Sequence, residues 1–207
     1  MRLIRARTLL LLAVFGAAVA GAVTAGVLAY HAYYVGEFGV VVPGMLYRSR
    51  QPRGWQWSVL DRHGIRSVIN LRADYEATED LREERHRIDE AGLRLVRIPI
   101  SAELPSYEQF EQFIREVRAG PRPTLVHCEH GRNRTGFMSA AYLVVMEGWT
   151  VERAMSDMER YGGRPRGEKR RRLIEMLSDM RDHRDEWRAR TDPGAPTATA
   201  PATQPDA

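Results

Sequence analysis

The amino-acid sequence predicts an α/β fold with a mainly parallel sheet flanked by helices, preceded by one N-terminal transmembrane helix. Three observations lead to this prediction. Between residues 44 and 190, apolar strand-like runs alternate with helical stretches, the pattern of parallel strands joined by crossover helices. Residues 8–30 carry no charged side chain, and a helix needs about 20 apolar residues to cross a bilayer. A composition of 43% hydrophobic and 28% charged residues supports a packed core and excludes a wholly disordered chain.

Four segments have the composition and periodicity of strands. Residues 44–50, GMLYRSR, indicate a short strand or an extended entry to the domain. Residues 66–71, RSVINL, form an apolar β-branched run typical of a strand buried on both faces. Residues 93–98, LRLVRI, alternate in polarity, and residues 124–127, TLVH, indicate a short buried strand.

Helical stretches separate and follow these strands. Gly64 and Gly92 lie where the first two helices are expected to stop. Ser106 and Gln109 form the sequence pattern of a capping box at the start of the third. The expected helices comprise residues 55–63, 78–91, 106–119, 135–147, 151–161 and 169–190.

The N-terminal segment, residues 1–30, predicts a single-span anchor in the inner or cell membrane. Three arginines precede the apolar run and none follows until Arg48, so the positive-inside rule places the rest of the chain on the periplasmic or extracellular side. A cleaved signal peptide is the alternative, because Ala18, Ala20 and Ala22 would suit a peptidase. The apolar cores of signal peptides usually have about 7 to 15 residues, so the longer run favours the anchor.

The remaining chain divides into a linker at 31–43, a folded domain at 44–190 and a tail at 191–207. The tail is rich in Pro, Ala and Thr, so we expect it to be disordered. The 31 basic residues are dispersed among 27 acidic ones and match no nucleic-acid-binding motif, so no nucleic-acid partner is expected. The single cysteine, Cys128, excludes an internal disulfide framework and a cysteine-rich zinc finger.

The functional signal lies around Cys128. A buried strand is expected before it and an apolar helix after it, which places the intervening loop at the carboxyl end of a strand, where ligands bind in α/β sheets. Loop amides at a helix N-terminus form an anion site. We therefore assign Cys128 as nucleophile, because a helix N-terminus and nearby cations stabilise a thiolate. Arg134 offers a planar fork suited to two phosphoryl oxygens, and Thr135 can donate its hydroxyl to the sulfur.

The residues between Cys128 and Arg134 are expected to wrap the phosphate with backbone N–H groups. Gly131 allows a backbone conformation with positive φ. His127 is expected to brace the loop from outside it. The candidate phosphate-binding residues are Glu129, His130, Gly131, Arg132, Asn133 and Arg134. The side chains of Glu129, His130, Arg132 and Asn133 are expected to turn outward, with Arg132 adding positive potential.

Residues 127–136, HCEHGRNRTG, resemble the signature loop HCxxGxxRTG of the cysteine-based protein tyrosine phosphatases. Residues 46–52, LYRSRQP, and 64–72, GIRSVINLR, extend the resemblance to the dual-specificity group, especially its bacterial and atypical members. The resemblance covers about residues 44–161. It implies a dual-specificity-phosphatase-like fold, no metal or other cofactor, and a phosphocysteine intermediate that water hydrolyses. Loop amides and the arginine then stabilise charge on the transferring group.

The family also uses a general acid, usually an aspartate, on a loop before the cysteine. Here the corresponding loop reads SAELP and contains no aspartate. Glu103 is its only carboxylate and is our candidate for the acid. Asp74 is the alternative, and an enzyme without a strong acid would favour leaving groups of low pKa.

The sequence leaves open the substrate class, the kind of activity and the roles of two arginines. The substrate is a phosphorylated protein, a phospholipid or a small phosphomonoester. A phosphoinositide or lipid phosphatase is the alternative enzyme, and a catalytically weak phosphate-binding module is the alternative outside enzymes. Arg48 and Arg72 either reach the substrate or pair with carboxylates.

Overall fold

The computed structural model describes residues 2–30, 38–76, 79–101 and 104–194, which fall into two compact units, Met1–Gly39 and Val40–Ala207. In the first unit, α1 (Arg2–Tyr30) is one continuous helix. Its segment Leu11–Ala29 is long and apolar enough to cross a membrane, and none of that segment is buried. Thr24 satisfies its hydroxyl by donating to the carbonyl oxygen of Ala20 at 2.8 Å. A signal sequence near an N-terminus can pass the same test of length and composition.

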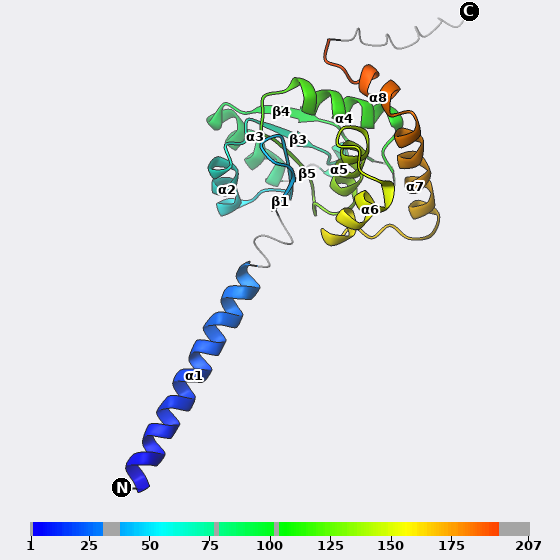
Figure 1. Cartoon of the computed structure of the whole chain (residues 1–207). Helices are drawn as coiled ribbons and strands as arrows, with labels where there is room; N and C mark the ends of the chain where they lie inside the picture. Colours follow the sequence, from blue (N-terminus) through cyan, green and yellow to red (C-terminus); the bar gives the residue numbers. More distant parts are fainter. Residues whose placement is uncertain (1, 31–37, 77–78, 102–103, 195–207) are drawn as a thin grey trace, which may run out of the picture. The chain divides into compact units, whose positions relative to one another are not determined.

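The second unit is built on a five-stranded sheet of order β1-β2-β5-β3-β4 (Figure 1). Its strands are β1 (Phe38–Val42), β2 (Leu46–Arg50), β3 (Ser67–Asn70), β4 (Arg94–Arg97) and β5 (Thr124–Cys128). The β2–β5, β5–β3 and β3–β4 pairs are parallel. Only three residues join β1 to β2, too few for a crossover, so β1 runs antiparallel at the edge. The sheet is thus mixed, with four of its five strands parallel.

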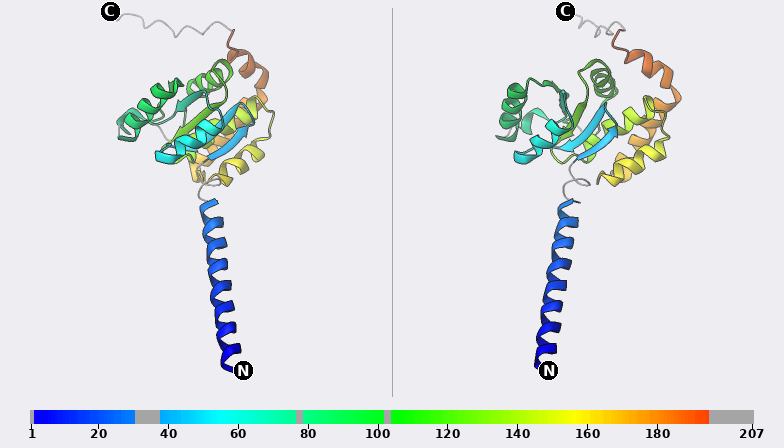
Figure 2. Two further views of the ribbon diagram at one scale, coloured as in Figure 1. Left: turned by 90° about the vertical axis from the view of Figure 1, so that its left-hand side faces the viewer. Right: turned by 60° about the vertical axis from the view of Figure 1, so that its left-hand side comes forward.

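Helices cover both faces of this sheet, which is why β3 and β5 are buried along their whole length. On one side lie α2 (Trp57–Arg62) and α3 (Glu79–Ala91), and on the other α5 (Asn133–Val145), α6 (Val151–Arg160) and α7 (Gly167–Asp182) (Figure 2). Alternate residues of β5 therefore face different helices. Val126 and Cys128 belong to the larger core beside α5, and His127 faces α3.

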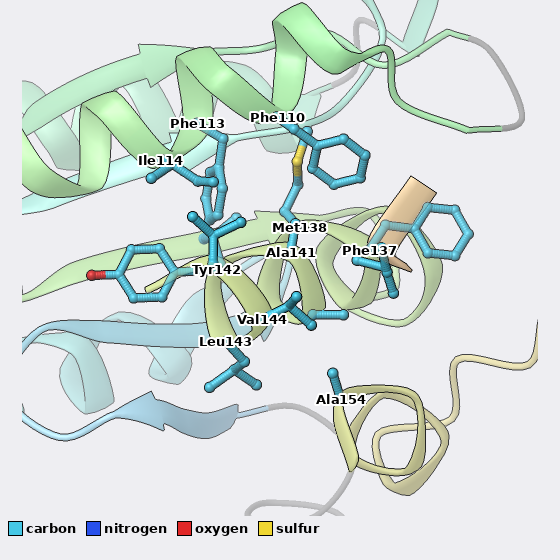
Figure 3. Packing of buried hydrophobic residues seen from close by; sticks show 14 of the residues in the cluster. Phe110, Phe113, Ile114, Phe137, Met138, Ala141, Tyr142, Leu143, Val144 and Ala154 are labelled. Carbon is cyan, nitrogen blue, oxygen red and sulfur yellow. The ribbon is translucent and has the colours of Figure 1, made fainter. Parts of the chain in front are cut away.

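The larger core is centred on α5, whose residues from Thr135 to Val145 are all buried. Figure 3 shows Phe110, Phe113 and Ile114 of α4 (Tyr107–Ala119) packed towards α5. The rings of Phe113 and Tyr142 meet edge to face, with centroids 6.5 Å apart. The expected capping box starts α4. Ser106 Oγ accepts a hydrogen bond from the backbone N–H of Gln109, and Gln109 Oε1 accepts one from the backbone N–H of Ser106. A rigid, fully packed α5 fixes the position of the loop that precedes it.

The structure differs from the expected elements in several places. Residues 38–42 form a strand in the stretch assigned to the linker. Helix α5, expected at residues 135–147, begins at Asn133, two residues earlier than expected, so Arg134 lies in its first turn. Thr191, assigned to the tail, is buried and donates its hydroxyl to the Trp187 carbonyl oxygen at 2.7 Å.

The helix expected at 169–190 is also wrong as a single element, because it breaks at His183 into α7 and α8 (Arg184–Arg190). The break lets α8 close over the end of α5. Arg188 donates to the carbonyl oxygens of Val145 and Met146 at 2.9 and 2.8 Å, where the last turn of α5 lacks helical partners. Arg118 of α4 in turn donates to the Arg188 carbonyl oxygen at 2.6 Å.

Trp187 anchors α8, and its removal is expected to be costly. The side chain is 2% exposed, and its ring lies 5.8 Å from that of Tyr107. Trp187→Ala should lower the free energy of unfolding by about 3–5 kcal/mol, as for other buried aromatic truncations. Denaturant unfolding of the full chain in detergent measures this loss. Tyr75→Ala, at a ring that is 75% exposed, is the control and should stay within about 0.5 kcal/mol of the parent. Equal losses would contradict the anchoring role.

Candidate active site

The loop of residues 129–132 joins the central strand β5 to α5 (Figure 1). Cys128 is the last residue of β5, lies in register with Arg50 and is 3% exposed. The parallel strands β2, β3 and β5 end at the same edge of the sheet, the position where ligands bind in α/β folds. As the sequence indicates, the cysteine thus lies between a buried strand and the N-terminus of a buried helix.

Gly131 is required both by its conformation and by its surroundings. Its φ is 65°, in the left-handed region that favours glycine. A Cβ atom at this position would lie 2.6 Å from the backbone of Ser49 and Arg50. The Gly131 carbonyl oxygen accepts from Arg48 Nη2 at 2.8 Å, and the Glu129 carbonyl oxygen accepts from the Gln51 amide at 3.2 Å. These contacts hold the loop against the end of β2.

Arg134 and Thr135 lie in the first turn of α5. The Arg134 side chain is half-buried and is engaged in interactions within the protein. Thr135 is fully buried, and its Oγ1 has no hydrogen-bond partner among the described residues. Burying a hydroxyl without a hydrogen-bond partner costs free energy. This hydroxyl can therefore donate to a charged group that develops during a reaction. Next to it, Gly136 packs on Met158 so closely that a Cβ atom would meet its Cγ at 2.6 Å, which seats α5 on α6.

The other loop side chains lie towards solvent. Glu129 Oε2 is 3.5 Å from His130 Nδ1, and their side chains are 42% and 63% exposed. Arg132 and Asn133 are also exposed. The stem of Arg132 lies against Gly162, where a Cβ atom would be 3.4 Å from its Cδ. This leaves the backbone of residues 129–132, rather than these side chains, to surround the site.

Arg48 connects three parts of the site from a buried position. Its Nη1 is 3.8 Å from Asp157 Oδ2 of α6, its guanidinium lies 4.2 Å from the centre of the Tyr161 ring, and its Nη2 donates to Gly131. Burial lowers the pKa of Arg48 to about 10 although Asp157 favours the charged form, and burial raises the pKa of Asp157 despite the arginine. Of the two roles left open by the sequence, the structure places Arg48 on a carboxylate and on the loop.

Arg72 likewise contacts a carboxylate. It follows β3, and its Nη1 lies 3.9 Å from Asp80 Oδ2 and 3.3 Å from Gln51 Oε1. Its side chain is 3% exposed. Both buried arginines therefore help to join the strand ends to the helices around them.

His127 is buried on the opposite face of the sheet from Cys128. Its Nε2 lies 2.5 Å from Glu84 Oε1, with the two side chains 0% and 2% exposed. The other carboxylate oxygen of Glu84 accepts from Asn70 Nδ2 at 2.5 Å. Sequence reasoning missed Glu84, although a signal existed. Glu84 stands on the inward stripe of α3, four positions before the buried Ile88.

The Glu84–His127 pair should make the free energy of unfolding depend on pH in the acid range. Burial raises the pKa of Glu84, but the charge of the adjacent His127 and the hydrogen bond from Asn70 outweigh it and bring the pKa below its usual 4.5. The unfolded chain then binds the proton first, so the pair's contribution is present above pH 4.5 and is lost as the pH falls through the lower folded pKa.

We expect Glu84→Gln to lower the free energy of unfolding at pH 7 by about 3 kcal/mol, because it leaves a buried partner unpaired. The variant should also lose less stability than the parent when the pH is lowered from about 5 to 3. Denaturant unfolding at both pH values checks this. Parallel acid profiles for parent and variant would contradict it.

Of the two candidates for the general acid, Glu103 lies outside the described residues. Asp74, the alternative, is 75% exposed and pairs with Arg97 at 2.9 Å. Within the described ranges, no group of three or more His, Cys, Asp or Glu side chains could hold a metal ion.

Comparison with known proteins connects this geometry to a family. A family model described as a DSP-PTPase phosphatase fused to NAD+ kinase matches residues 45–175. The dual specificity protein phosphatase TpbA of Pseudomonas aeruginosa strain UCBPP-PA14 is 31% identical over 119 residues, 56% of this chain and 51% of its own. The chain thus spans about half the length of the curated relatives it matches.

Solved structures agree with the fold. A crystal structure of P. aeruginosa TpbA has a TM-score of 0.57 at 25% identity, over 70% of this chain and 88% of the other. A cysteine-to-serine form of TpbA in complex with pTyr gives 0.54 at 25% identity, over 70% and 87%.

The catalytic domain of the PP-IP phosphatase Siw14 from S. cerevisiae shares the fold, with a TM-score of 0.58 at 21% identity over 72% and 93%. The family match lies across β2 to α7 and includes the whole Cys128 loop. On this match, the chain belongs to the dual-specificity group of the cysteine-based protein tyrosine phosphatase superfamily.

Proposed function

We propose that this protein is a phosphomonoester hydrolase of the dual-specificity or tyrosine phosphatase type, with Cys128 as nucleophile. The observation that carries the proposal is the placement of Cys128 at the end of the central strand, before a loop held by Gly131 and a helix whose first turn bears Arg134. Backbone N–H groups at such a helix N-terminus attract an anion. Family membership supports the same reading.

The reaction has two steps in this proposal. The Cys128 thiolate attacks phosphorus, an S–P bond forms, and the bond to the leaving oxygen breaks as an acid protonates that oxygen. Water then attacks the phosphorus of the phosphocysteine while the conjugate base of the acid takes a proton from it. A P–O bond forms, the S–P bond breaks, and phosphate and the Cys128 thiolate are released. Loop N–H groups and Arg134 stabilise charge on the phosphoryl oxygens in both steps. The Thr135 hydroxyl, which has no hydrogen-bond partner in the described part of the chain, donates to the departing sulfur in the second step.

Glu103 is the proposed general acid, and its contribution should depend on the leaving group. We expect Glu103→Gln to slow hydrolysis of a phosphoserine peptide about 10²-fold, because an alkyl oxygen needs a proton to leave. An aryl phosphate, whose leaving oxygen is less basic, should lose much less. Glu108→Gln, at an exposed glutamate on α4, is the control. An unchanged rate on phosphoserine removes Glu103 from this role, and the same comparison with Asp74→Asn then tests the alternative.

A phosphorylated protein is the substrate class we favour. TpbA is named a dual specificity protein phosphatase, and one of its structures holds pTyr. The likeness to Siw14, at 21% identity, concerns the fold and does not favour an inositol phosphate. The exposed carboxylate of Glu129 beside the site also opposes a substrate with several phosphates.

We further propose that α1 anchors the protein in the cytoplasmic membrane, with the phosphatase domain outside. The apolar segment Leu11–Ala29 and the three arginines before it support this orientation. Protease added to intact spheroplasts should remove the domain while leaving a cytoplasmic marker uncut. A domain protected until lysis would reverse the topology, and a shortened, soluble mature chain would show a signal peptide.

A substrate panel tests the proposed activity. The full chain in non-ionic detergent with EDTA is assayed for phosphate release from an aryl phosphate, phosphotyrosine and phosphoserine peptides, and phosphoinositide vesicles. We expect turnover without metal, fastest on the aryl phosphate and phosphotyrosine. Faster release from phosphoinositides would favour the lipid phosphatase. Absence of release from every member, with retained binding of phosphotyrosine peptide, would favour the phosphate-binding module.

A further inference from the structure

The turn after α6 packs against the last residue of the loop of residues 129–132. A Cβ atom on Gly162 would lie 3.4 Å from Cδ of Arg132, and one on Gly163 would lie 2.9 Å from the Arg132 carbonyl oxygen. Gly163 donates its backbone N–H to the carbonyl oxygen of Met158 at 3.0 Å, which turns the chain at the end of α6. Arg132 is the N-cap of α5. The loop is therefore held on one side by β2, through Gly131, and on the other by α6 and its turn.

Arg48 connects these two supports. Its Nη2 donates to the Gly131 carbonyl oxygen at 2.8 Å, and its guanidinium lies 4.2 Å from the centre of the Tyr161 ring. Its Nη1 is 3.8 Å from Asp157 Oδ2 and has no hydrogen-bond partner among the described residues. A buried cation is costly unless an opposite charge or an aromatic face compensates for its lost hydration. Asp157 and Tyr161, both at the C-terminal end of α6, provide that compensation.

The hydrogen bond from Arg48 also fixes the direction of an amide of the loop. The carbonyl oxygen of Gly131 and the backbone N–H of Arg132 belong to one peptide unit, which is planar. In a trans unit these two groups point in opposite directions. A carbonyl oxygen held on Arg48 therefore directs the Arg132 N–H away from that side chain. Because backbone N–H groups at the start of a helix bind anions, the position of the guanidinium bears directly on phosphate binding.

Asp157 carries a charge that opposes the proposed substrate. It pairs with the side chain that contacts the loop, and a carboxylate this near an anion site repels a phosphoryl group. Its side chain is 18% exposed, so solvent screens the charge only in part. Arg153 and Arg160 also interact with it electrostatically, and Arg48 is its ion-pair partner. A carboxylate at this position therefore indicates a positioning role that outweighs the repulsion.

We propose that Asp157 and Tyr161 are positioning residues of the phosphatase site. They keep the Arg48 guanidinium on the Gly131 carbonyl oxygen, and this contact in turn directs the N–H of Arg132 towards the phosphoryl group. The inference rests on the proposed function, because the phosphoryl group is the ligand of that loop. Both residues act through Arg48 rather than by touching the substrate. Their effect should therefore appear in the affinity of the loop for a tetrahedral oxyanion as well as in kcat/KM.

Asp157→Asn tests the inference by the sign of its effect. Inorganic phosphate is titrated against the alkylation by iodoacetamide of Cys128, the only cysteine in the chain. The phosphate concentration that halves the alkylation rate measures the affinity of the loop in the full chain in detergent, at neutral pH and without turnover. We expect Asp157→Asn to raise this concentration about tenfold, part of the loss that a displacement of about 1 Å causes in a catalytic site. Removing the charge without moving Arg48 would instead lower the concentration, because a repulsion is lost.

Conservative variants and a double variant separate positioning from general damage. Asp157→Glu keeps the charge and should recover part of the affinity for phosphate. Tyr161→Leu removes the aromatic face and should weaken phosphate binding, whereas Tyr161→Phe keeps the face and should retain most of the affinity. In an Arg48→Met background, Asp157→Asn should no longer weaken binding, because its effect passes through that guanidinium. If Arg48→Met does not fold, the comparison of Tyr161→Leu with Tyr161→Phe replaces it.

Glu116→Gln is the matched control. Glu116 Oε2 lies 2.6 Å from Arg94 Nη2, and its side chain is 23% exposed, close to the 18% of Asp157. Arg94 begins β4, so this pair lies at the edge of the sheet opposite Cys128. The variant should stay within about twofold of the parent in phosphate affinity and in kcat/KM, as expected for a distant surface pair.

Phosphate binding and turnover separate this inference from the proposed function. Unchanged or tighter phosphate binding in folded Asp157→Asn, or an equal loss in the Arg48→Met background, would overturn the positioning role. The expected pattern of phosphate affinities in a protein that hydrolyses no phosphomonoester would leave that role standing and overturn the phosphatase activity. In an active enzyme, kcat/KM for an aryl phosphate should fall with the phosphate affinity from variant to variant.

Discussion

Cys128→Ser is expected to abolish phosphate release from every substrate while leaving the fold intact. A serine hydroxyl is not ionised near neutral pH and is a far weaker nucleophile than a thiolate, so the attacking group is lost. The change replaces one buried atom in a side chain that forms no disulfide, so the packing around β5 is kept. Phosphate release and thermal unfolding of the same preparation measure both parts.

The serine variant should still bind substrate. Its loop amides and Arg134 are unchanged, and these groups make the phosphate contacts in the proposed mechanism. Titration calorimetry with a phosphotyrosine peptide should therefore detect binding without turnover. Turnover retained in a folded Cys128→Ser variant would show that the chemistry lies elsewhere.

Gly131→Ala is expected to lower activity about 10²-fold, because a displacement of about 1 Å in a catalytic loop has an effect of that size. Alanine is strained at a φ of 65°, and its Cβ would meet the backbone of Ser49 and Arg50 at 2.6 Å. Neither backbone can yield without disturbing β2, so the loop must move instead. Its carbonyl oxygen then moves away from Arg48, its buried donor. kcat/KM on an aryl phosphate measures the loss.

Gly64→Ala is the matched control for this substitution. Gly64 has a φ of 63°, nearly that of Gly131, but nothing lies within 4 Å of its Cβ position. Both variants should lose about 1–2 kcal/mol of stability from the left-handed conformation. Only Gly131→Ala should lose activity. If the two variants kept equal activity, the tight contact with β2 would have no part in shaping the loop.

Much of the fold was predictable because its elements carry strong local signals. The β-branched run ending at Leu71 and the capping box of Ser106 both specify their elements within a few residues. The break at His183 could not be predicted, since it depends on Arg188 reaching the end of α5, which is distant in sequence. β1 is a short edge strand whose pairing with β2 is set by tertiary structure rather than by local composition.

Some residues of the site could be predicted from local sequence, and others could not. The spacing of Cys128, Gly131 and Arg134 identified the loop, because the chemistry needs these residue types close together in the chain. The partners of this region come from distant segments: Arg48 of β2 contacts the loop, and Glu84 of α3 contacts His127 in the preceding strand. Their positions in the sequence indicate burial only weakly. A charged residue on the buried face of a helix also does not reveal which distant residue it pairs with.

Rapid quenching of a single turnover tests the central claim most directly. The full chain is mixed with radiolabelled phosphotyrosine peptide, quenched within milliseconds under conditions that preserve thiophosphate bonds, and digested for mass spectrometry. The proposed mechanism predicts a phosphoryl group on Cys128 that appears before free phosphate and decays as phosphate is released. Phosphate release with no labelled Cys128 at any time, or with the label on another residue, would contradict it.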